Sequence, residues 1–268
     1  MVNSKIKFIA NNIFPSLTLG IFEMKGFYVK RLVKYASKQI KPEQKILDAG
    51  DGSCQWKKYF KHANYESTDF EQIFNQGDKK LHDFICDIKK IPKEDNTYDA
   101  ILNIEVLEHV PEPLKVLKEF YRILKPSGKL FLTTPQSWAV HGYPYNYFNF
   151  TKGGLEYLFK EAGFKKYKIY PKGGIVKEIA VKLKELPIYI LSQYFKVKKV
   201  DNKIKIKKKN PLAIILLPLF LISWIIFQVI IPLLAYPIDK LDKEKDFTIG
   251  YCCVVEKGIS YKSSKVKK

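Results

Sequence analysis

The sequence predicts an α/β fold, in which a mostly parallel β-sheet carries helices on both of its faces. Three observations lead to this prediction. Short apolar runs of strand length alternate with amphipathic helical patterns along the first 171 residues. The first of these runs, KILDA at 45–49, leads into a glycine-rich turn, as a buried parallel strand does. Hydrophobic residues make up 46% of the chain, which suffices for a packed core.

The first half of this pattern begins with a helix. Residues 24–40 have apolar side chains at helical spacing, and Pro42 then ends helical pairing. The apolar side of the helix is expected to consist of Phe27, Leu32, Val33 and Tyr35. The elements that follow are a strand at 45–49, a helix at 55–63, and strands at 65–70, 83–88 and 98–104.

The second half contains the clearest helical pattern of the chain, at 111–124. Pro111 suits a first helical position, and Leu114, Leu117, Phe120, Tyr121 and Leu124 make one apolar face. The sequence PSG at 126–128 ends this helix. The elements that follow are a strand at 129–134, a helix at 154–162 with Thr151 as its cap and Gly163 at its end, and a strand at 164–170.

The composition changes after Pro171. Residues 172–210 are rich in lysine, residues 211–238 carry no charged side chain, and FTIGYCCVV at 247–255 is typical of a strand. A helical hydrophobic insert is therefore expected before the last strand. The expected parts are an N-terminal helical segment (1–40), a core (41–171), a basic and hydrophobic insert (172–246), a last core strand (247–257) and a basic tail (258–268).

Acidic residues and glycines follow the predicted strands in order. Asp48 closes the first strand, immediately before the turn with Gly50 and Gly52. Asp69 closes the second strand 21 residues later, where an acid can bond the hydroxyls of a ribose. Asp87 follows the third strand and can accept from an adenine amino group. The dinucleotide fingerprint GxGxxG is not matched, because Gln55 stands at its third glycine position.

These stretches together resemble the large family of methyltransferases that depend on S-adenosylmethionine (SAM), often called type 11. The stretches that carry the resemblance are ILDAGDG, STDF, CDI, YDAILNIEVLEHVPEP and FYRILKPSGKLFLTTP. It covers about residues 41–169, and residues 247–257 as a final strand. It implies a Rossmann-like, seven-stranded, mostly parallel sheet, in which the final strand runs antiparallel between the fifth and the sixth.

The same resemblance implies a SAM-binding site. The glycines pass under the methionine part of SAM, Asp48 holds its amino group, and Asp69 binds the ribose. The residues implied at the adenine are Asp87 and Ile88, and those at the methyl-donor end are Asn103, Ile104 and Glu105. Cys54 stands where the family has the third glycine of its turn, and tighter helix packing rather than lost binding is expected there.

Three residues are candidates for proton transfer. Methyl transfer from a sulfonium is a direct displacement, so alignment of the reactants matters most, but a hydroxyl or amine acceptor must also lose a proton. His141, in the aromatic stretch SWAVHGYPYNYFNF at 137–150, is the first candidate base. Glu105 and His109 are the other two. The alternatives are that His109 holds the following helix in place, Glu105 is a solvated acid and His141 is a solvated loop residue.

The net charge of +20 favours anionic partners, and the lysines are concentrated beside the uncharged stretch. Residues 196–238 are therefore expected to contact an anionic membrane surface, with 211–238 either as a helical hairpin that enters and returns or as a segment that lies in the interface. The return follows from the last strand, which has to join the sheet on the same side of the membrane. The expected location is the cytoplasmic side of the membrane, in monotopic or peripheral form.

The acceptor is then expected to be a lipid, a quinone or a saccharide-linked molecule. Two alternatives remain open: a soluble small-molecule methyltransferase whose insert is a dimer interface or lid, and a non-catalytic membrane scaffold with the SAM fold. A nucleic-acid partner is not expected, because neither a helix-turn-helix nor a zinc module is recognisable. The four cysteines do not form a zinc-site pattern, and no metal is expected. The oligomeric state is left open.

Overall fold

The computed structural model describes residues 24–50, 52–70, 82–200, 203–208 and 225–259. The chain divides into two compact units. The first, here called the sheet unit, comprises residues 28–136, 147–170 and 251–268. The second, here called the helical unit, comprises residues 1–27, 137–146 and 171–250. The insert that the sequence predicts at 172–246 lies within the last of these ranges.

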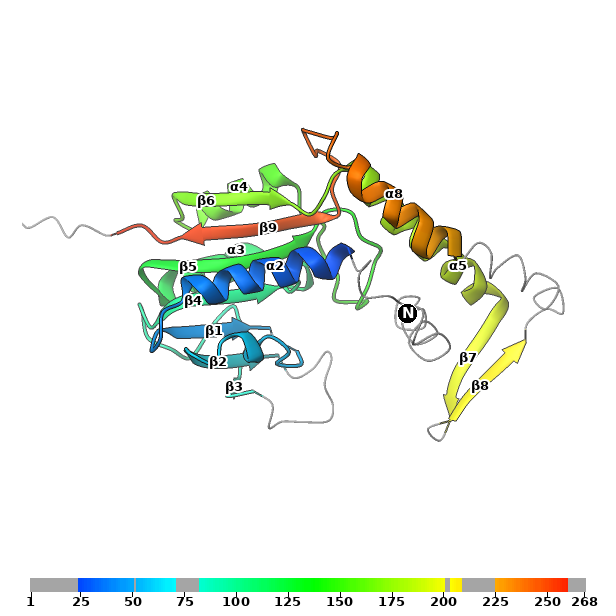
Figure 1. The fold of residues 1–268 in the computed structure, drawn as a ribbon. Helices are drawn as coiled ribbons and strands as arrows, with labels where there is room; N and C mark the ends of the chain where they lie inside the picture. Colours follow the sequence, from blue (N-terminus) through cyan, green and yellow to red (C-terminus); the bar gives the residue numbers. More distant parts are fainter. Residues whose placement is uncertain (1–23, 51, 71–81, 201–202, 209–224, 260–268) are drawn as a thin grey trace, which may run out of the picture. The chain divides into compact units, whose positions relative to one another are not determined.

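The sheet unit is built on a seven-stranded sheet with the strand order β3-β2-β1-β4-β5-β9-β6 (Figure 1). Strands β2 and β4 both pair in parallel with β1, β3 pairs in parallel with β2, and β5 in parallel with β4. The strands are β1 (Lys45–Ala49), β2 (Asn64–Asp69), β3 (Phe84–Ile85), β4 (Tyr98–Ile104), β5 (Leu124–Pro135), β6 (Lys166–Pro171) and β9 (Gly250–Glu256). The predicted α/β fold is confirmed.

The final strand β9 lies between β5 and β6, as the resemblance implied. The amide of Ser127, near the start of β5, donates to the carbonyl of Lys257, just after the end of β9. At the opposite ends of the two strands, the amide of Ser137 donates to the carbonyl of Ile249. This pairing of starts with ends makes β9 antiparallel to β5, and Figure 1 shows β9 pointing against its neighbours.

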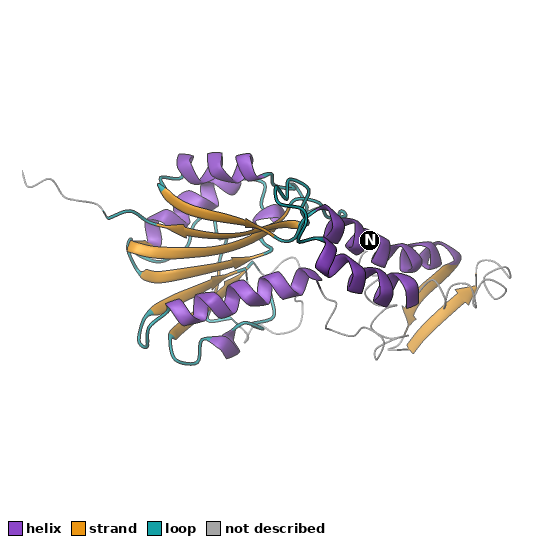
Figure 2. Ribbon diagram, turned by 45° about the horizontal axis from the view of Figure 1, so that its top comes forward, coloured by secondary structure: helices purple, strands orange, loops and turns teal. Residues whose placement is uncertain are grey.

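Helices cover both faces of the sheet (Figure 2). Helix α2 (Met24–Gln39) packs on one face, and its side chains share a buried cluster with the inward residues Ile46, Leu102 and Phe131. Helices α3 (Pro113–Ile123) and α4 (Lys152–Glu161) cover the other face. The cap predicted for α4 is confirmed, because Thr151 Oγ1 accepts from the amide of Gly154 at 3.1 Å.

The buried face of α2 differs from the prediction. Leu32 and Val33 are buried as expected, but Phe27 and Tyr35 are exposed. The remaining buried residues of the helix are Val29 and Ala36. The prediction chose the side of the helix that carries large aromatic residues. The side that packs on the sheet instead carries smaller apolar residues, spaced three and four apart.

Two further predictions, in the region of the glycine turn, were wrong. The helix predicted at 55–63 is reduced to the single 3₁₀ turn η2 (Lys57–Tyr59), after a series of turns in which Gly52 and Cys54 have φ of 63° and 52°. The strand predicted at 83–88 is only the two residues of β3. Here the amide of Asp83 donates to the carbonyl of Ser67, but the Asp83 carboxylate, not a backbone carbonyl, accepts from the amide and hydroxyl of Ser67.

The predicted helix at 111–124 begins and ends differently. It starts at Pro113, with Glu112 at the N-cap position, because residues 107–109 form the separate 3₁₀ turn η3 (Leu107–His109). It ends at Ile123, because Leu124 has the extended dihedrals φ −71° and ψ 138° and already begins β5. Strand β5 is therefore longer than the strand predicted at 129–134.

The helical unit contains a pair of helices and a β-hairpin. Helix α5 (Ile175–Tyr194) packs along the π-helical turn η4 (Ile226–Ile230) and α8 (Ile231–Ile238), as Figure 1 also shows. In the chain between α5 and η4, β7 (Phe195–Val200) and β8 (Lys203–Lys208) form an antiparallel β-hairpin. The hairpin predicted within 211–238 lies partly outside the described residues. Its described part packs against α5, a helix that was not predicted from the lysine-rich composition of residues 172–210.

A buried carboxylate joins the two helices of this unit. Asp239, directly after α8, accepts from the amides of Gly174 and Lys177 at 3.0 Å each, and these amides lie at the N-terminus of α5. Its second oxygen lies 3.3 Å from the ammonium of Lys177. The end of α8 thus caps the start of α5. Among the described helices, none combines the length and the apolar character that a membrane crossing needs.

Candidate active site

The turn after β1 requires glycine. Gly50 has φ of 88°, and a Cβ atom there would lie 2.6 Å from Val106 Cγ1. Its amide donates to the carbonyl of Thr68 on β2 at 2.8 Å. Gly52, with φ of 63°, donates its amide to Asp69 Oδ2 at 2.7 Å. The backbone therefore passes closely over the carboxyl ends of β1 and β2, and the side chain of Val106 occupies the space that a Cβ at Gly50 would take.

Asp48 lies directly before this turn and is 1% exposed. The hydroxyl of Tyr65 donates to Asp48 Oδ2 at 2.6 Å. The parallel register places Asp48 opposite Ser67, so Tyr65, two residues earlier on β2, is on the same face of the sheet. Tyr65 was not predicted from the sequence, because only the register of β1 and β2 shows that a tyrosine on one strand lies beside an acid on the other.

The acids that follow β2 and β3 have different surroundings. Asp69 accepts from the amides of Gly52 and Phe70, which ties the end of β2 to the glycine turn. Asp87 accepts from the amide of Lys89 at 2.9 Å, the hydrogen bond of a turn residue. Ile88 is buried in the core beside these turns.

The end of β4 provides a buried polar group. Asn103 is fully buried, and its Nδ2 donates to the carbonyl of Ala49 at 2.8 Å. Its Oδ1 is buried and has no hydrogen-bond partner in the described part of the chain. Such an acceptor is costly to bury unless a ligand or solvent molecule satisfies it. Ile104 is half-buried beside it.

Glu105 leaves β4 in a left-handed conformation, with φ of 56°. Its amide donates to the carbonyl of Thr133 on β5 at 3.0 Å, which holds this backbone in place. A residue with a side chain costs about 1–2 kcal/mol in this region, and such residues cluster at functional sites. The conformation re-aims the chain from β4 into the η3 turn.

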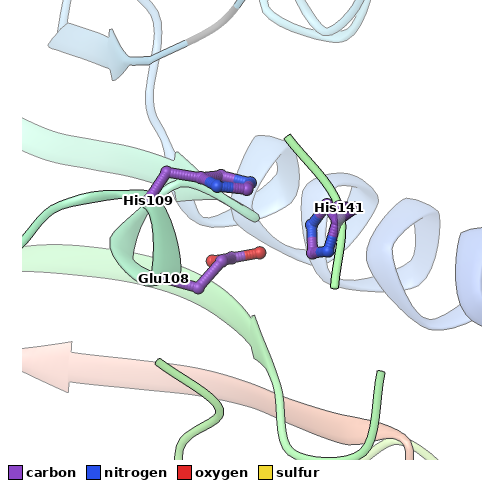
Figure 3. Close-up of side chains that lie close together, drawn as sticks. All are labelled: Glu108, His109 and His141. Carbon is purple, nitrogen blue, oxygen red and sulfur yellow. The ribbon is translucent and has the colours of Figure 1, made fainter. Parts of the chain in front are cut away.

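The η3 turn carries a second acid that the sequence analysis did not single out. Glu108 is fully buried, and its carbonyl accepts from the amides of Tyr147 and Phe148 at 2.9 and 3.3 Å. The amide of His109 donates to the carbonyl of Val106 at 2.9 Å. Figure 3 shows the side chains of Glu108 and His109 projecting from this turn. Its place as a charged residue among the apolar residues of the motif EVLEHV could have identified Glu108 from the sequence.

His141, the first candidate base, belongs to the helical unit, whereas Glu105 and His109 belong to the sheet unit. Its Nδ1 lies 3.0 Å from the carbonyl of Ala139, and its amide donates to Asn146 Oδ1 at 3.3 Å. Both contacts are within the 137–146 loop. His141 therefore helps to hold the conformation of its own loop through these two contacts.

Two thiols lie near the carboxyl end of β2. Cys54 Sγ is 3.6 Å from both Ser67 Oγ and His82 Nδ1. Its φ of 52° explains why the family prefers glycine at this position. Cys86 Sγ lies 3.3 Å from Thr68 Oγ1, and burial raises the pKa of the Cys86 thiol. Cys86 is accordingly a neutral packing residue at physiological pH.

Comparison with known proteins places this arrangement in a family. A family model described as a methyltransferase domain matches residues 23–169, which is more than half of the chain. The chain belongs to the SAM-dependent methyltransferase family. The match includes the glycine turn, the acids that follow β1 and β2, and the region from β4 to η3.

Several methyltransferases are similar to parts of the chain. Cycloartenol-C-24-methyltransferase 1 of Oryza sativa is 32% identical over 38% of this chain and 32% of its own length. A ubiquinone biosynthesis O-methyltransferase of Xanthomonas oryzae is 45% identical over 16% of this chain and 18% of its own. Demethylmenaquinone methyltransferase of Lysinibacillus sphaericus is 29% identical over 49% and 61%. These matches thus span less than two thirds of each relative.

Among solved structures, the chain is similar to phosphoethanolamine N-methyltransferase 2 of Haemonchus contortus in complex with SAM. The identity is 16%, the match covers 82% of this chain and 50% of that chain, and the TM-score is 0.47.

The residues present fit the cofactor of this methyltransferase family. In the glycine turn, Gly50 packs against Val106, and a Cβ at Gly52 would meet only Asp69 Oδ2, at 3.7 Å, so the backbone at Gly52 has room for a ligand. The buried Oδ1 of Asn103 offers an acceptor at the end of β4. Asp69 lies at the end of β2, the strand next to β1 on the side away from β4. A nucleoside bound across the carboxyl ends of these strands meets the acid and the turn together.

Proposed function

We propose that this chain transfers the methyl group of SAM to a small hydrophobic acceptor at the cytoplasmic surface of a membrane. The acceptor class is a lipid, a quinone or a saccharide-linked molecule. The observation that carries the methyl transfer is the glycine turn at Gly50, closed against Val106 and linked through Gly52 to Asp69. In this proposal Asp69 binds the ribose, and Asp48, oriented by Tyr65, faces the methionine amino group.

SAM supplies an activated methyl group, so the chain mainly has to hold and align the two reactants. The acid Glu105 stands at the end of β4, in a backbone conformation that the hydrogen bond to Thr133 maintains. Asn103 offers its buried oxygen from the same strand. Acceptors with an ionisable hydroxyl or amine also need a base, for which Glu105, His109 and His141 are the candidates.

The acceptor class and the location rest on other observations. Three relatives have names that describe methylation of a sterol, a ubiquinone precursor or a menaquinone precursor. All of these acceptors are membrane lipids in chemical character. Exposed apolar side chains on α5 and α8, and the lysines of β7 and β8, favour action at a membrane surface. The lysine-rich composition favours the cytoplasmic side.

The test is a calorimetric titration of SAM into the full chain purified in mild detergent, beside the variant Asp69→Ala. The proposal expects saturable binding by the wild type and a loss of at least about tenfold in affinity in the variant, because charged hydrogen bonds are removed. Asp95→Ala, an exposed acid far along the chain, is the matched control and should bind as the wild type does. A folded wild-type protein that does not bind SAM would favour the scaffold interpretation.

Turnover is tested with SAM carrying a labelled methyl group. Label should enter lipid-soluble products when demethylated quinones, sterols or membrane-extracted saccharide lipids are offered. SAM binding without transfer to any hydrophobic acceptor, together with transfer to a water-soluble one, would contradict the acceptor class while leaving the methyl transfer intact.

A further inference from the structure

The helix pair of the helical unit exposes its large apolar side chains. Among the α5 side chains that the structure describes, the exposed large apolar ones are Ile175, Ile179 and Leu186. Those of η4, α8 and the residue before them are Ile225, Ile226, Ile230, Leu233, Leu234, Tyr236 and Ile238. Ile179 is 50% exposed and Leu234 is 59% exposed. The spacings of four and seven residues place the exposed residues of α5 on one side of that helix, whereas those of η4 and α8 extend around a wide face.

Among the side chains of these helices that the structure describes, the fully buried ones are small or charged. Ala180 on α5 and Ala235 on α8 are buried, as are Lys177 and Glu178. Lys177 pairs with Asp239 at 3.3 Å and lies over the ring of Tyr236 at 4.6 Å, while Glu178 pairs with Lys182 at 2.6 Å. A helix pair that faces water has the opposite arrangement, with its large apolar residues inside.

This inverted polarity is the pattern of helices that have lipid as their solvent. Small residues at the contact let two helices approach closely, and ionisable groups turn inward and pair with one another. Asp239 and Lys177 fulfil the second condition, and Ala180 and Ala235 have the size that the first requires. An aqueous environment would favour neither arrangement.

The β-hairpin of the same unit adds charge. The antiparallel register places Lys196 opposite Lys207 and Lys198 opposite Lys205. Because positions alternate along a strand, these lysines and Lys203 occupy register positions on one face. The other face has Val197, Ile204 and Ile206 among its positions. Like charges at opposed positions repel, so the hairpin is stabilised by an anionic partner that extends over several lysines.

We infer that α5, α8 and the β7–β8 hairpin together form a docking surface for a bilayer that contains anionic phospholipid. This inference rests on the proposed function, and it adds the lipid that these elements bind. The exposed apolar stripes enter the interface between headgroups and acyl chains, and the lysines meet the headgroup phosphates. Helix α5 is thereby part of the docking surface, together with the described residues 225–238.

The experiment is sedimentation of the purified full chain with vesicles of phosphatidylcholine, alone or mixed with phosphatidylglycerol. The wild type should sediment with the mixed vesicles. The double variant Ile179→Glu with Leu234→Glu should lose at least about tenfold in vesicle affinity, because two apolar side chains leave the interface. Its control is Tyr157→Glu, which changes an exposed aromatic residue on α4 of the sheet unit and should bind as the wild type does.

A second pair of variants separates charge from apolar contact. Lys198→Glu with Lys205→Glu should abolish the preference for phosphatidylglycerol. Lys152→Glu with Lys160→Glu changes the total charge equally on exposed positions of α4 and should keep that preference. Circular dichroism and SAM titration accompany each variant, so that a loss of fold is recognised.

Two results would overturn the docking surface. One is unchanged vesicle binding by the Ile179 and Leu234 variant. The other is a wild-type dimer in analytical ultracentrifugation that ignores vesicles and that this variant converts to a monomer, which assigns the apolar stripes to a second copy. A chain that docks on vesicles but fails to bind SAM contradicts the proposed function alone. A chain that binds SAM but ignores vesicles contradicts the docking surface alone.

Discussion

The hydroxyl of Tyr65 on β2 donates to the buried carboxylate of Asp48 on β1 at a distance of 2.6 Å. This hydrogen bond fixes the orientation of an acid that lies directly before the glycine turn. Asp48 is almost fully buried, so loss of the donor leaves part of its charge without compensation. Tyr65 is therefore a positioning residue for the methionine end of the SAM site.

Tyr65→Phe is expected to weaken SAM binding by about tenfold, which corresponds to about 1.4 kcal/mol, the usual range for a hydrogen bond to a charged group. Calorimetric titration with SAM measures the effect. The control is Tyr59→Phe, since the ring of Tyr59 packs on Trp56 at 6.3 Å and keeps this contact without its hydroxyl. Equal SAM affinity in Tyr65→Phe and the wild type would refute the positioning role.

Gly50→Ala is expected to abolish SAM binding and to destabilise the sheet unit by about 2–3 kcal/mol. The added Cβ would lie 2.6 Å from Val106 Cγ1, and the backbone φ of 88° is unfavourable for alanine. Urea unfolding and SAM titration measure the two effects. Gly153→Ala is the matched control, because a Cβ there meets no atom within 4 Å and α4 gains helix propensity. If Gly50→Ala binds SAM normally, the turn does not approach the ligand as we infer.

Glu66 links three elements of the sheet unit. It accepts from Tyr98 at 2.6 Å and pairs with Lys93 at 2.9 Å and Lys45 at 2.7 Å. Burial alone would raise the pKa of Glu66, but these hydrogen bonds outweigh it and bring the pKa to about 2, from an ordinary value of 4.5. Because the pKa is lower in the folded state, ionised Glu66 stabilises the fold at pH values above 4.5.

This contribution, roughly 3 kcal/mol at most, is lost as the pH falls from 4.5 through about 2. Glu66→Gln should accordingly be less stable than the wild type at neutral pH, and the difference should vanish near pH 2. Chemical unfolding at a series of pH values measures it. Glu94→Gln, at an exposed position, should follow the wild-type curve throughout. A pH-independent difference for Glu66→Gln would show that packing, not charge, is responsible.

Asp239→Ala is expected to loosen the helix pair by about 3 kcal/mol, because the amides of Gly174 and Lys177 lose their acceptor and the buried Lys177 loses its partner. Hydrogen exchange of the α5 amides is the direct measurement and should become faster. Glu244→Ala, an exposed acid nearby in the sequence, serves as the control. SAM binding should stay intact in both variants. Unchanged exchange in Asp239→Ala would mean that the cap contributes nothing to the pair.

The local patterns predicted most of the sheet but failed where backbone conformation departs from regular structure. The strand at 98–104 and the cap at Thr151 followed from periodicity and residue chemistry, and both are observed. The helix at 55–63 did not form, because Gly52 and Cys54 take positive φ and the chain closes onto Asp69 instead. Pro111 was mistaken for the helix start because the η3 turn before Pro113 has no periodic signal.

The sequence by itself determined the class of the fold, the glycine turn and the acids that follow β1 and β2. These features depend on local periodicity and on residue types, such as glycine in a tight turn, whose role can be recognised from the local sequence. Only the tertiary structure decided that Tyr65 meets Asp48, that Val106 closes on Gly50, and that α8 pairs with α5. The reason is physical: strand register and helix pairing bring distant residues together, and no single segment encodes which partner it will meet.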